Sequence, residues 1–85
     1  MELVAVVKRD CETCRLVEPV LAQIRGRAPL ALYSQDDTAF PESLGGSQDD
    51  TALERSWRLR IETVPTLIRF EGDKEVARIA GWDRA

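Results

Sequence analysis

The chain has 85 residues, 44% of them hydrophobic and 32% charged, with a formal net charge of −3. This length allows one compact hydrophobic core, so we expect a single domain over residues 1–85. The acidic balance, without any basic block, argues against nucleic-acid binding, and the absence of histidine excludes Cys-His and Ser-His catalytic pairs.

The first predicted element is a strand over the apolar run from Leu3 to Val7. The run shows no alternation of polar and apolar residues, which is typical of a central strand covered on both faces. It is far shorter than the ~20 apolar residues of a membrane span. Lys8 and Arg9 follow it at once, unlike the flanks of a signal peptide. We therefore expect a protein of the reducing cytoplasm with no membrane partner.

A helix is expected over residues 14–25, directly after the sequence Asp10-Cys11-Glu12-Thr13-Cys14. Its apolar residues recur at helical spacing on one face: Leu16, Val17, Val20, Leu21 and Ile24. Gly26 directly after this segment is expected to end the helix. Pro19 is expected to kink this helix, because an interior proline loses one backbone hydrogen bond.

The next segment combines a short strand, Leu30–Tyr33, with a polar loop over residues 34–50. The hexapeptide Ser-Gln-Asp-Asp-Thr-Ala occurs twice around this loop, at Ser34–Ala39 and at Ser47–Ala52. We expect a solvated loop whose second copy starts the next helix, because Ser47 and Asp50 resemble a capping box. A metal site built from the four aspartates of the repeats is an alternative, although their spacing does not match a calcium loop.

The second half of the chain predicts a helix over residues 51–60 and a hairpin over residues 66–80 with its turn at residues 71–74. The helix is expected to turn three residues inward: Leu53, Trp57 and Leu59. The full order is β-α-β-α-β-β, which predicts an α/β fold with a four-stranded mixed sheet and helices packed on it. Asp83 would start a final helix that is short or missing.

The two cysteines indicate thiol chemistry. Cys11 is expected at the start of a helix, where unpaired backbone N–H groups and the helix dipole stabilise a thiolate. Cys14 then lies close enough to attack a mixed disulfide formed on Cys11. A disulfide that closes a loop of roughly four residues restrains the unfolded chain very little. The pair therefore serves redox chemistry, with Cys11 as nucleophile and Cys14 as resolving thiol, or it binds a metal.

The run from Ser56 to Phe70 contains the tripeptide Val64-Pro65-Thr66, and Gly81 follows sixteen residues after Pro65. Together with the C-x-x-C motif, this order resembles the thioredoxin-like superfamily over roughly residues 3–81. The resemblance implies a minimal thioredoxin-like fold with a cis proline beside the cysteines. It also implies that Val64, Pro65 and Gly81 contact the substrate.

The motif departs from the familiar Trp-Cys-Gly-Pro-Cys of thioredoxins, because carboxylates now flank the nucleophile and the aromatic residue is lost. Negative neighbours disfavour a thiolate, and nearby cations offset this in part. The residues expected to tune the pair are Asp10, Glu12, Thr13 and Arg15. Ala5 stands where thioredoxins carry a buried aspartate that helps to move protons to the resolving cysteine.

These observations predict a thiol-disulfide oxidoreductase that reduces protein or small-molecule disulfides without a cofactor or a metal. The expected electron donor is a dithiol or a thioredoxin-reductase-like protein. Because the final helix is nearly missing, we expect either a fragment of a longer chain or a homodimer formed across the bare sheet face. Two alternatives remain: a C-x-x-C module for soft metals such as Cu(I), Hg(II) or a shared zinc ion, and a non-catalytic interaction domain of a larger protein.

Overall fold

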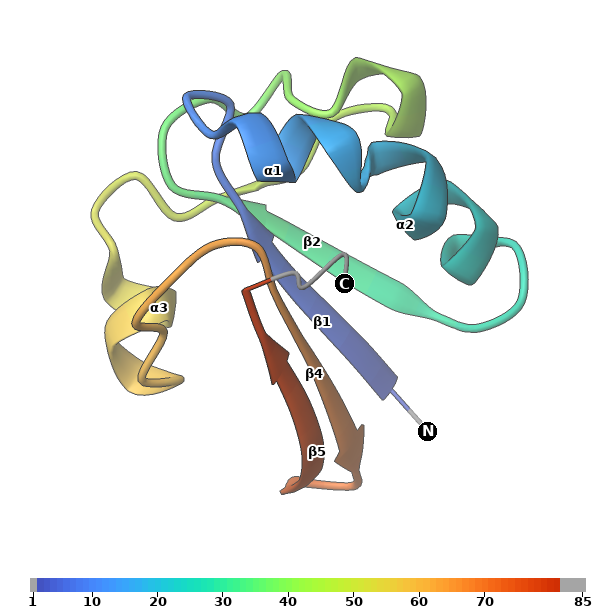
Figure 1. The fold of residues 1–85 in the computed structure, drawn as a ribbon. Helices are drawn as coiled ribbons and strands as arrows, with labels where there is room; N and C mark the ends of the chain where they lie inside the picture. The colour runs from blue at the N-terminus through green and yellow to red at the C-terminus, as the bar shows by residue number, and fades with distance from the viewer. Residues whose placement is uncertain (1, 82–85) are drawn as a thin grey trace.

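The fold is built on a mixed sheet of five strands in the order β3-β2-β1-β4-β5 (Figure 1). The structure is a computed structural model, and it describes residues 2–81. The elements in chain order are β1 (Glu2–Val7), α1 (Glu12–Leu16), α2 (Glu18–Arg25), β2 (Leu30–Ser34), the short 3-10 helix η1 (Glu42–Leu44), β3 (Gln48–Asp49), α3 (Glu54–Arg58), β4 (Thr66–Glu71) and β5 (Lys74–Ala80). The predicted α/β class and the predicted hairpin are confirmed.

Strand β1 lies at the centre of the sheet, as predicted from its continuous apolar run. It pairs in parallel with β2, where Ala5 faces Leu32, and antiparallel with β4, where Ala5 faces Leu67. The side chains of β1 alternate between the two faces. Ala5 and Val7 join the core beneath α1 and α2, whereas Val4 and Val6 pack on the opposite face. Burial of each valine stabilises the fold by roughly 1.5–3 kcal/mol.

The predicted helix over residues 14–25 is wrong in its form, because two helices replace one kinked helix. Helix α1 ends before Val17 and α2 begins after it, so Pro19 lies in the first turn of α2. A proline in a first turn loses no intrahelical hydrogen bond, because the N–H groups there have no partner within the helix. Both helices cover the same face of the sheet (Figure 1).

Helix α3 is shorter than predicted, and two of its three expected inward residues point outward. Leu53 is 48% exposed and Trp57 is 80% exposed, whereas Leu59 packs against the sheet as expected. The reason is the buried carboxylate of Asp50, which accepts hydrogen bonds from the Ser56 N–H and the Ser56 hydroxyl. This holds Ser56 on the inner face, and the next side chain of the helix then points away.

The polar loop after β2 contains a fifth strand that the sequence did not predict. Strand β3 has only two residues and pairs in parallel with the end of β2, where Tyr33 faces Gln48 and Ser34 faces Asp49. The expected capping box is not formed, because the Ser47 hydroxyl donates to the Phe40 carbonyl oxygen instead. The expected C-terminal helix falls on residues 82–85, which lie outside the described residues.

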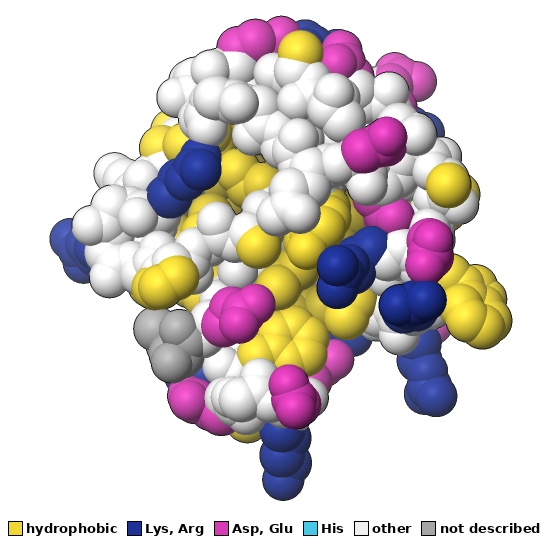
Figure 2. Space-filling model, turned by 180° about the vertical axis from the view of Figure 1, so that it is seen from behind, with side chains coloured by type: hydrophobic (Ala, Val, Ile, Leu, Met, Phe, Trp, Pro, Cys, Tyr) yellow, Lys and Arg dark blue, Asp and Glu magenta, His cyan; other side chains and the backbone are white. Residues whose placement is uncertain are grey.

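The face of the sheet opposite α1 and α2 is only partly covered. Hydrophobic side chains gather at the centre of this side of the molecule (Figure 2). They border a hollow of about 250 Å³ whose apolar lining consists of Val4, Tyr33, Leu59 and Phe70. Edge strand β5 exposes Val76 and Ile79, and Ile79 pairs with Leu67 on the helix-covered face of the sheet. Within residues 2–81, no helix is long and apolar enough to cross a membrane.

Candidate functional site

The sheet topology brings the C-x-x-C motif and the Val64-Pro65-Thr66 tripeptide to one edge of the sheet. Strands β1 and β4 are antiparallel, and Val6 near the end of β1 faces Thr66 at the start of β4. The chain that leaves β1 therefore reaches Cys11 at the same edge from which Pro65 enters β4. These segments are more than fifty residues apart in the sequence, so only the sheet register places them together.

Cys11 is the N-cap residue of α1, with extended backbone angles of φ −157° and ψ 109°. Its sulfur accepts a hydrogen bond from the Cys14 N–H at 3.2 Å. The thiol donates to the carbonyl oxygen of Val64 at 3.7 Å, and the side chain is half-buried. Cys11 thus presents a sulfur that is reachable from solvent beside the backbone of Val64.

Cys14 lies behind Cys11, is fully buried, and packs in the core with Val7 and Val17. Burial raises the pKa of the Cys14 thiol from 9.0 to about 12, because a thiolate is poorly solvated there, and the contact with Cys11 raises the pKa further. The Lys8 backbone amide acts in the opposite direction and lowers this pKa. The two thiols are not joined by a disulfide. Cys14 is therefore a neutral thiol near pH 7, and it is buried behind the Cys11 sulfur.

Pro65 and Gly81 complete the arrangement around the cysteines. The Val64–Pro65 peptide is cis and Pro65 is buried. The Gly81 N–H donates to the Pro65 carbonyl oxygen at 2.9 Å. Gly81 has a φ of +74°, a left-handed conformation that glycine adopts without steric penalty. The structure thus brings Val64, Pro65 and Gly81 to the same edge as Cys11.

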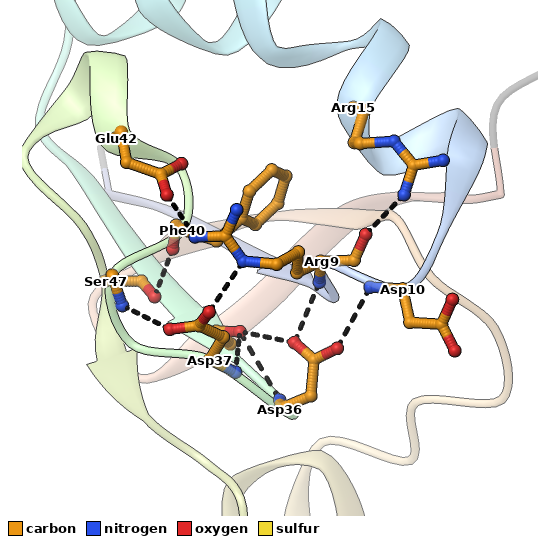
Figure 3. A network of polar contacts seen from close by, with 10 residues as sticks. Arg9, Asp10, Arg15, Asp36, Asp37, Phe40, Glu42 and Ser47 are labelled. Carbon is orange, nitrogen blue, oxygen red and sulfur yellow. Dashed lines mark hydrogen bonds and ion pairs between the residues drawn. The ribbon is translucent and has the colours of Figure 1, made fainter.

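The four expected tuning residues surround the pair in different ways. Asp10 and Glu12 are exposed, and Thr13 is half-buried within α1. The Arg15 guanidinium donates to the Arg9 backbone oxygen at 2.6 Å (Figure 3). Arg15 therefore stabilises the turn before Cys11 by this hydrogen bond to the backbone of Arg9.

A polar network that the sequence did not predict lies directly before Cys11 (Figure 3). The Arg9 side chain donates to Asp37 at 2.6 Å and pairs with Glu42, and its guanidinium lies 5.4 Å from the centre of the Phe40 ring. Asp36 accepts hydrogen bonds from backbone N–H groups of the same turn. One signal was available, because chain segments that follow neighbouring parallel strands meet at one edge of a sheet.

A hollow of about 330 Å³ lies on the Val64 side of the pair. Its lining includes Lys8, Glu62 and Thr63 together with Val64. Val64 lines this hollow and also accepts the hydrogen bond from the Cys11 thiol. Among residues 2–81, no group of three or more Cys, Asp or Glu side chains is placed to hold a metal ion. The four aspartates of the two hexapeptides therefore form no such group.

The sequence matches no family model. It is 28% identical over 71 residues to thioredoxin H2-2 of Oryza sativa subsp. japonica, an alignment that covers 84% of this chain and 45% of that protein. The chain thus spans less than half the length of this curated relative.

Solved thioredoxins share the architecture. Thioredoxin O2 from Arabidopsis thaliana, in the oxidized state, is 26% identical with a TM-score of 0.65, covering 96% of this chain and 64% of that one. Thioredoxin 1 from Thermosipho africanus is 17% identical with a TM-score of 0.67, covering 94% of this chain and 76% of that one. Thioredoxin f2 from Chlamydomonas reinhardtii is 18% identical, also with a TM-score of 0.67, covering 94% and 65%. These similarities confirm the fold class expected from the sequence.

Proposed function

The chain belongs to the thioredoxin-like superfamily, and from this premise we propose that it is a thiol-disulfide oxidoreductase that reduces disulfides through Cys11 and Cys14. One observation carries the proposal. The accessible Cys11 sulfur lies at the start of α1, within 3.7 Å of the Val64 carbonyl oxygen, and the buried Cys14 thiol lies directly behind it. An accessible sulfur backed by a second thiol is the arrangement that two-step disulfide exchange requires.

The proposed reaction has two steps. The Cys11 thiolate attacks one sulfur of a substrate disulfide, forms a mixed disulfide and releases the other substrate sulfur as a thiolate. Cys14 then loses its proton and attacks the Cys11 sulfur, which releases the second substrate sulfur. The two protons of the Cys11 and Cys14 thiols end on the two substrate thiols. The substrate gains two electrons, and the protein is left with a Cys11–Cys14 disulfide.

The different surroundings of the two thiols support their order of reaction. Cys11 is half-buried and can meet a disulfide from outside, whereas Cys14 is fully buried with a pKa raised to about 12. A neutral, buried thiol does not compete for the first attack. Once Cys11 is held in a mixed disulfide, its sulfur lies next to Cys14, and the second attack is intramolecular and correspondingly favoured.

Protein segments with an accessible disulfide are the proposed substrates, and small disulfides are alternatives. An extended segment in the hollow beside Val64 would pair with the Val64 backbone by strand addition, with Pro65 and Gly81 as further contacts. The exposed carboxylates of Asp10 and Glu12 would meet the substrate next to the reacting sulfur. A dithiol or a thioredoxin-reductase-like protein would return two electrons to the pair. We place this reaction in the reducing cytoplasm, where thiols persist.

Insulin reduction with dithiothreitol as donor tests the proposal. The wild-type protein should accelerate the reduction well above the rate with dithiothreitol alone. Cys11→Ser should abolish the acceleration, because it removes the attacking sulfur, and Cys14→Ser should abolish multiple turnovers. Wild-type protein that gives no acceleration, or a Cys11→Ser variant as active as the wild type, would overturn the proposed function.

A further inference from the structure

The segment of residues 8–10 connects β1 to Cys11 without regular secondary structure, yet two of its three backbone N–H groups donate to one side chain. The Arg9 N–H donates to Oδ1 of Asp36 at 2.8 Å. The Asp10 N–H donates to Oδ2 of the same carboxylate at 2.9 Å. The Lys8 backbone amide lowers the pKa of the Cys14 thiol. One carboxylate therefore binds two consecutive backbone amides of the turn before Cys11.

Asp36 is itself held in place at the end of β2. The Ser34 hydroxyl donates to Oδ1 of Asp36 at 3.2 Å, and the same hydroxyl oxygen accepts from the Asp37 N–H at 3.1 Å. Ser34 is fully buried, so this turn is anchored in the core. Desolvation opposes ionisation of Asp36, but the hydrogen bonds from Asp10, Arg9 and Ser34 outweigh it and lower the pKa of the carboxyl. Both oxygens are thus free of protons near pH 7 and accept from both amides.

The Arg9 side chain makes a second connection between the same two segments. Its Nε donates to Asp37, its guanidinium pairs with Glu42, and it lies over the ring of Phe40 (Figure 3). These groups are exposed or half-buried. Exposed ion pairs contribute little to stability. The Asp36 side chain is also exposed, but its two oxygens bind two consecutive backbone amides, so it restrains the main chain of the turn that precedes Cys11 directly.

We propose that Asp36 is a positioning residue for disulfide exchange, because its carboxylate fixes the backbone of residues 9 and 10 and thereby places the Cys11 sulfur for attack. Asp36 acts on Cys11 through the backbone, and its charge separately raises the pKa of the Cys14 thiol. This inference rests on the proposed function, since positioning has a kinetic effect only if the pair performs disulfide exchange. It also gives the first copy of the repeated hexapeptide a role at the active site.

The second copy of the hexapeptide supplies a matched control. Asp49 occupies the same place in Ser47–Ala52 that Asp36 occupies in Ser34–Ala39. Its carboxylate accepts the N–H of Thr51 at 2.8 Å, two residues further along the chain, and it is exposed on edge strand β3. Asp36→Asn and Asp49→Asn therefore remove the same charge from the same local sequence. Only the first loosens the turn before Cys11, because an amide nitrogen cannot accept the second N–H.

The test is the pH profile of the second-order rate constant for exchange between the reduced protein and dithionitrobenzoate. The plateau at high pH reports the reactivity of the fully formed thiolate, so a shift of the titration alone leaves it in place as long as the variant stays folded. We expect Asp36→Asn to lower this plateau about tenfold, and Asp49→Asn to change it less than about twofold. Asp36→Glu, which keeps the carboxylate, should recover part of the loss.

The outcomes separate this inference from the proposed function. If the wild-type protein reacts no faster than a free thiol, the proposed function fails. If the wild-type protein is active and Asp36→Asn keeps its plateau, the inference fails and the function stands. Should Asp36→Asn not fold, Ser34→Ala replaces it, because that variant keeps the carboxylate but removes its anchor. An unchanged plateau in folded Ser34→Ala would then overturn the inference.

Discussion

Burial of the Cys14 thiol predicts that the reduced protein loses stability as the solution becomes alkaline. The pKa of this thiol rises from 9.0 to about 12 in the folded protein, mainly because burial disfavours the thiolate. Above pH 9 the unfolded chain releases the proton while the folded protein keeps it. The stabilising effect of the neutral thiol is therefore fully present below pH 9 and is lost as the pH rises toward 12.

The size of the effect follows from the two pKa values. Each pH unit between them lowers the free energy of unfolding by at most ~1.4 kcal/mol. Starting from the ordinary value of 9.0, the loss between about pH 8 and about pH 10.5 sums to about 2 kcal/mol.

Urea unfolding of the reduced wild-type protein and of Cys14→Ala, at both pH values, isolates this effect. Other groups titrate in both proteins and cancel in the difference of the two unfolding free energies. That difference should shift by about 2 kcal/mol against the wild-type protein at the higher pH. A difference that stays constant with pH would refute the reasoning, because the Cys14 thiol would then not be desolvated in the folded state.

Three further substitutions test the framework around the pair by urea unfolding. Asp50→Ala leaves the N–H groups of Arg55 and Ser56 without their acceptor, so we expect a loss of about 2–4 kcal/mol; a loss below about 1 kcal/mol contradicts these hydrogen bonds. Gly81→Ala places a Cβ at a φ of +74° and should cost about 1–2 kcal/mol, and an unchanged stability would exclude that backbone conformation. Trp57→Ala should change stability by less than about 0.5 kcal/mol because the ring is 80% exposed, whereas a large loss would place it in a core.

The sequence predicted the elements whose signals are local. The continuous apolar run of residues 3–7 is sufficient to identify a buried central strand, and the alternation of residues 66–80 around Gly72 identifies the hairpin. The C-x-x-C motif and the Val64-Pro65-Thr66 tripeptide are also short and contiguous. Their meeting at one edge follows from the strand order of the sheet, whereas the resemblance to a known family implied only that the proline lies beside the cysteines.

The features that were missed depend on contacts between distant residues. The orientation of α3 is set by the hydrogen bonds of Asp50 to Ser56, so the apolar spacing of Leu53 and Trp57 was misleading. Strand β3 has two residues and exists only because the end of β2 offers a partner. The Asp36 carboxylate binds amides 26 and 27 residues earlier in the chain, and no local pattern encodes such a contact.

The most direct test of the central claim is to trap the mixed disulfide. Reduced Cys14→Ser and reduced Cys11→Ser would each be mixed with a disulfide-linked peptide, and the adducts identified by mass spectrometry under denaturing, acid-quenched conditions. We predict that Cys14→Ser accumulates a peptide adduct on Cys11, because the resolving thiol is gone, and that Cys11→Ser accumulates none over the same time. An adduct on Cys14 that forms as fast, or no adduct on Cys11, would contradict the assignment of Cys11 as the attacking thiol.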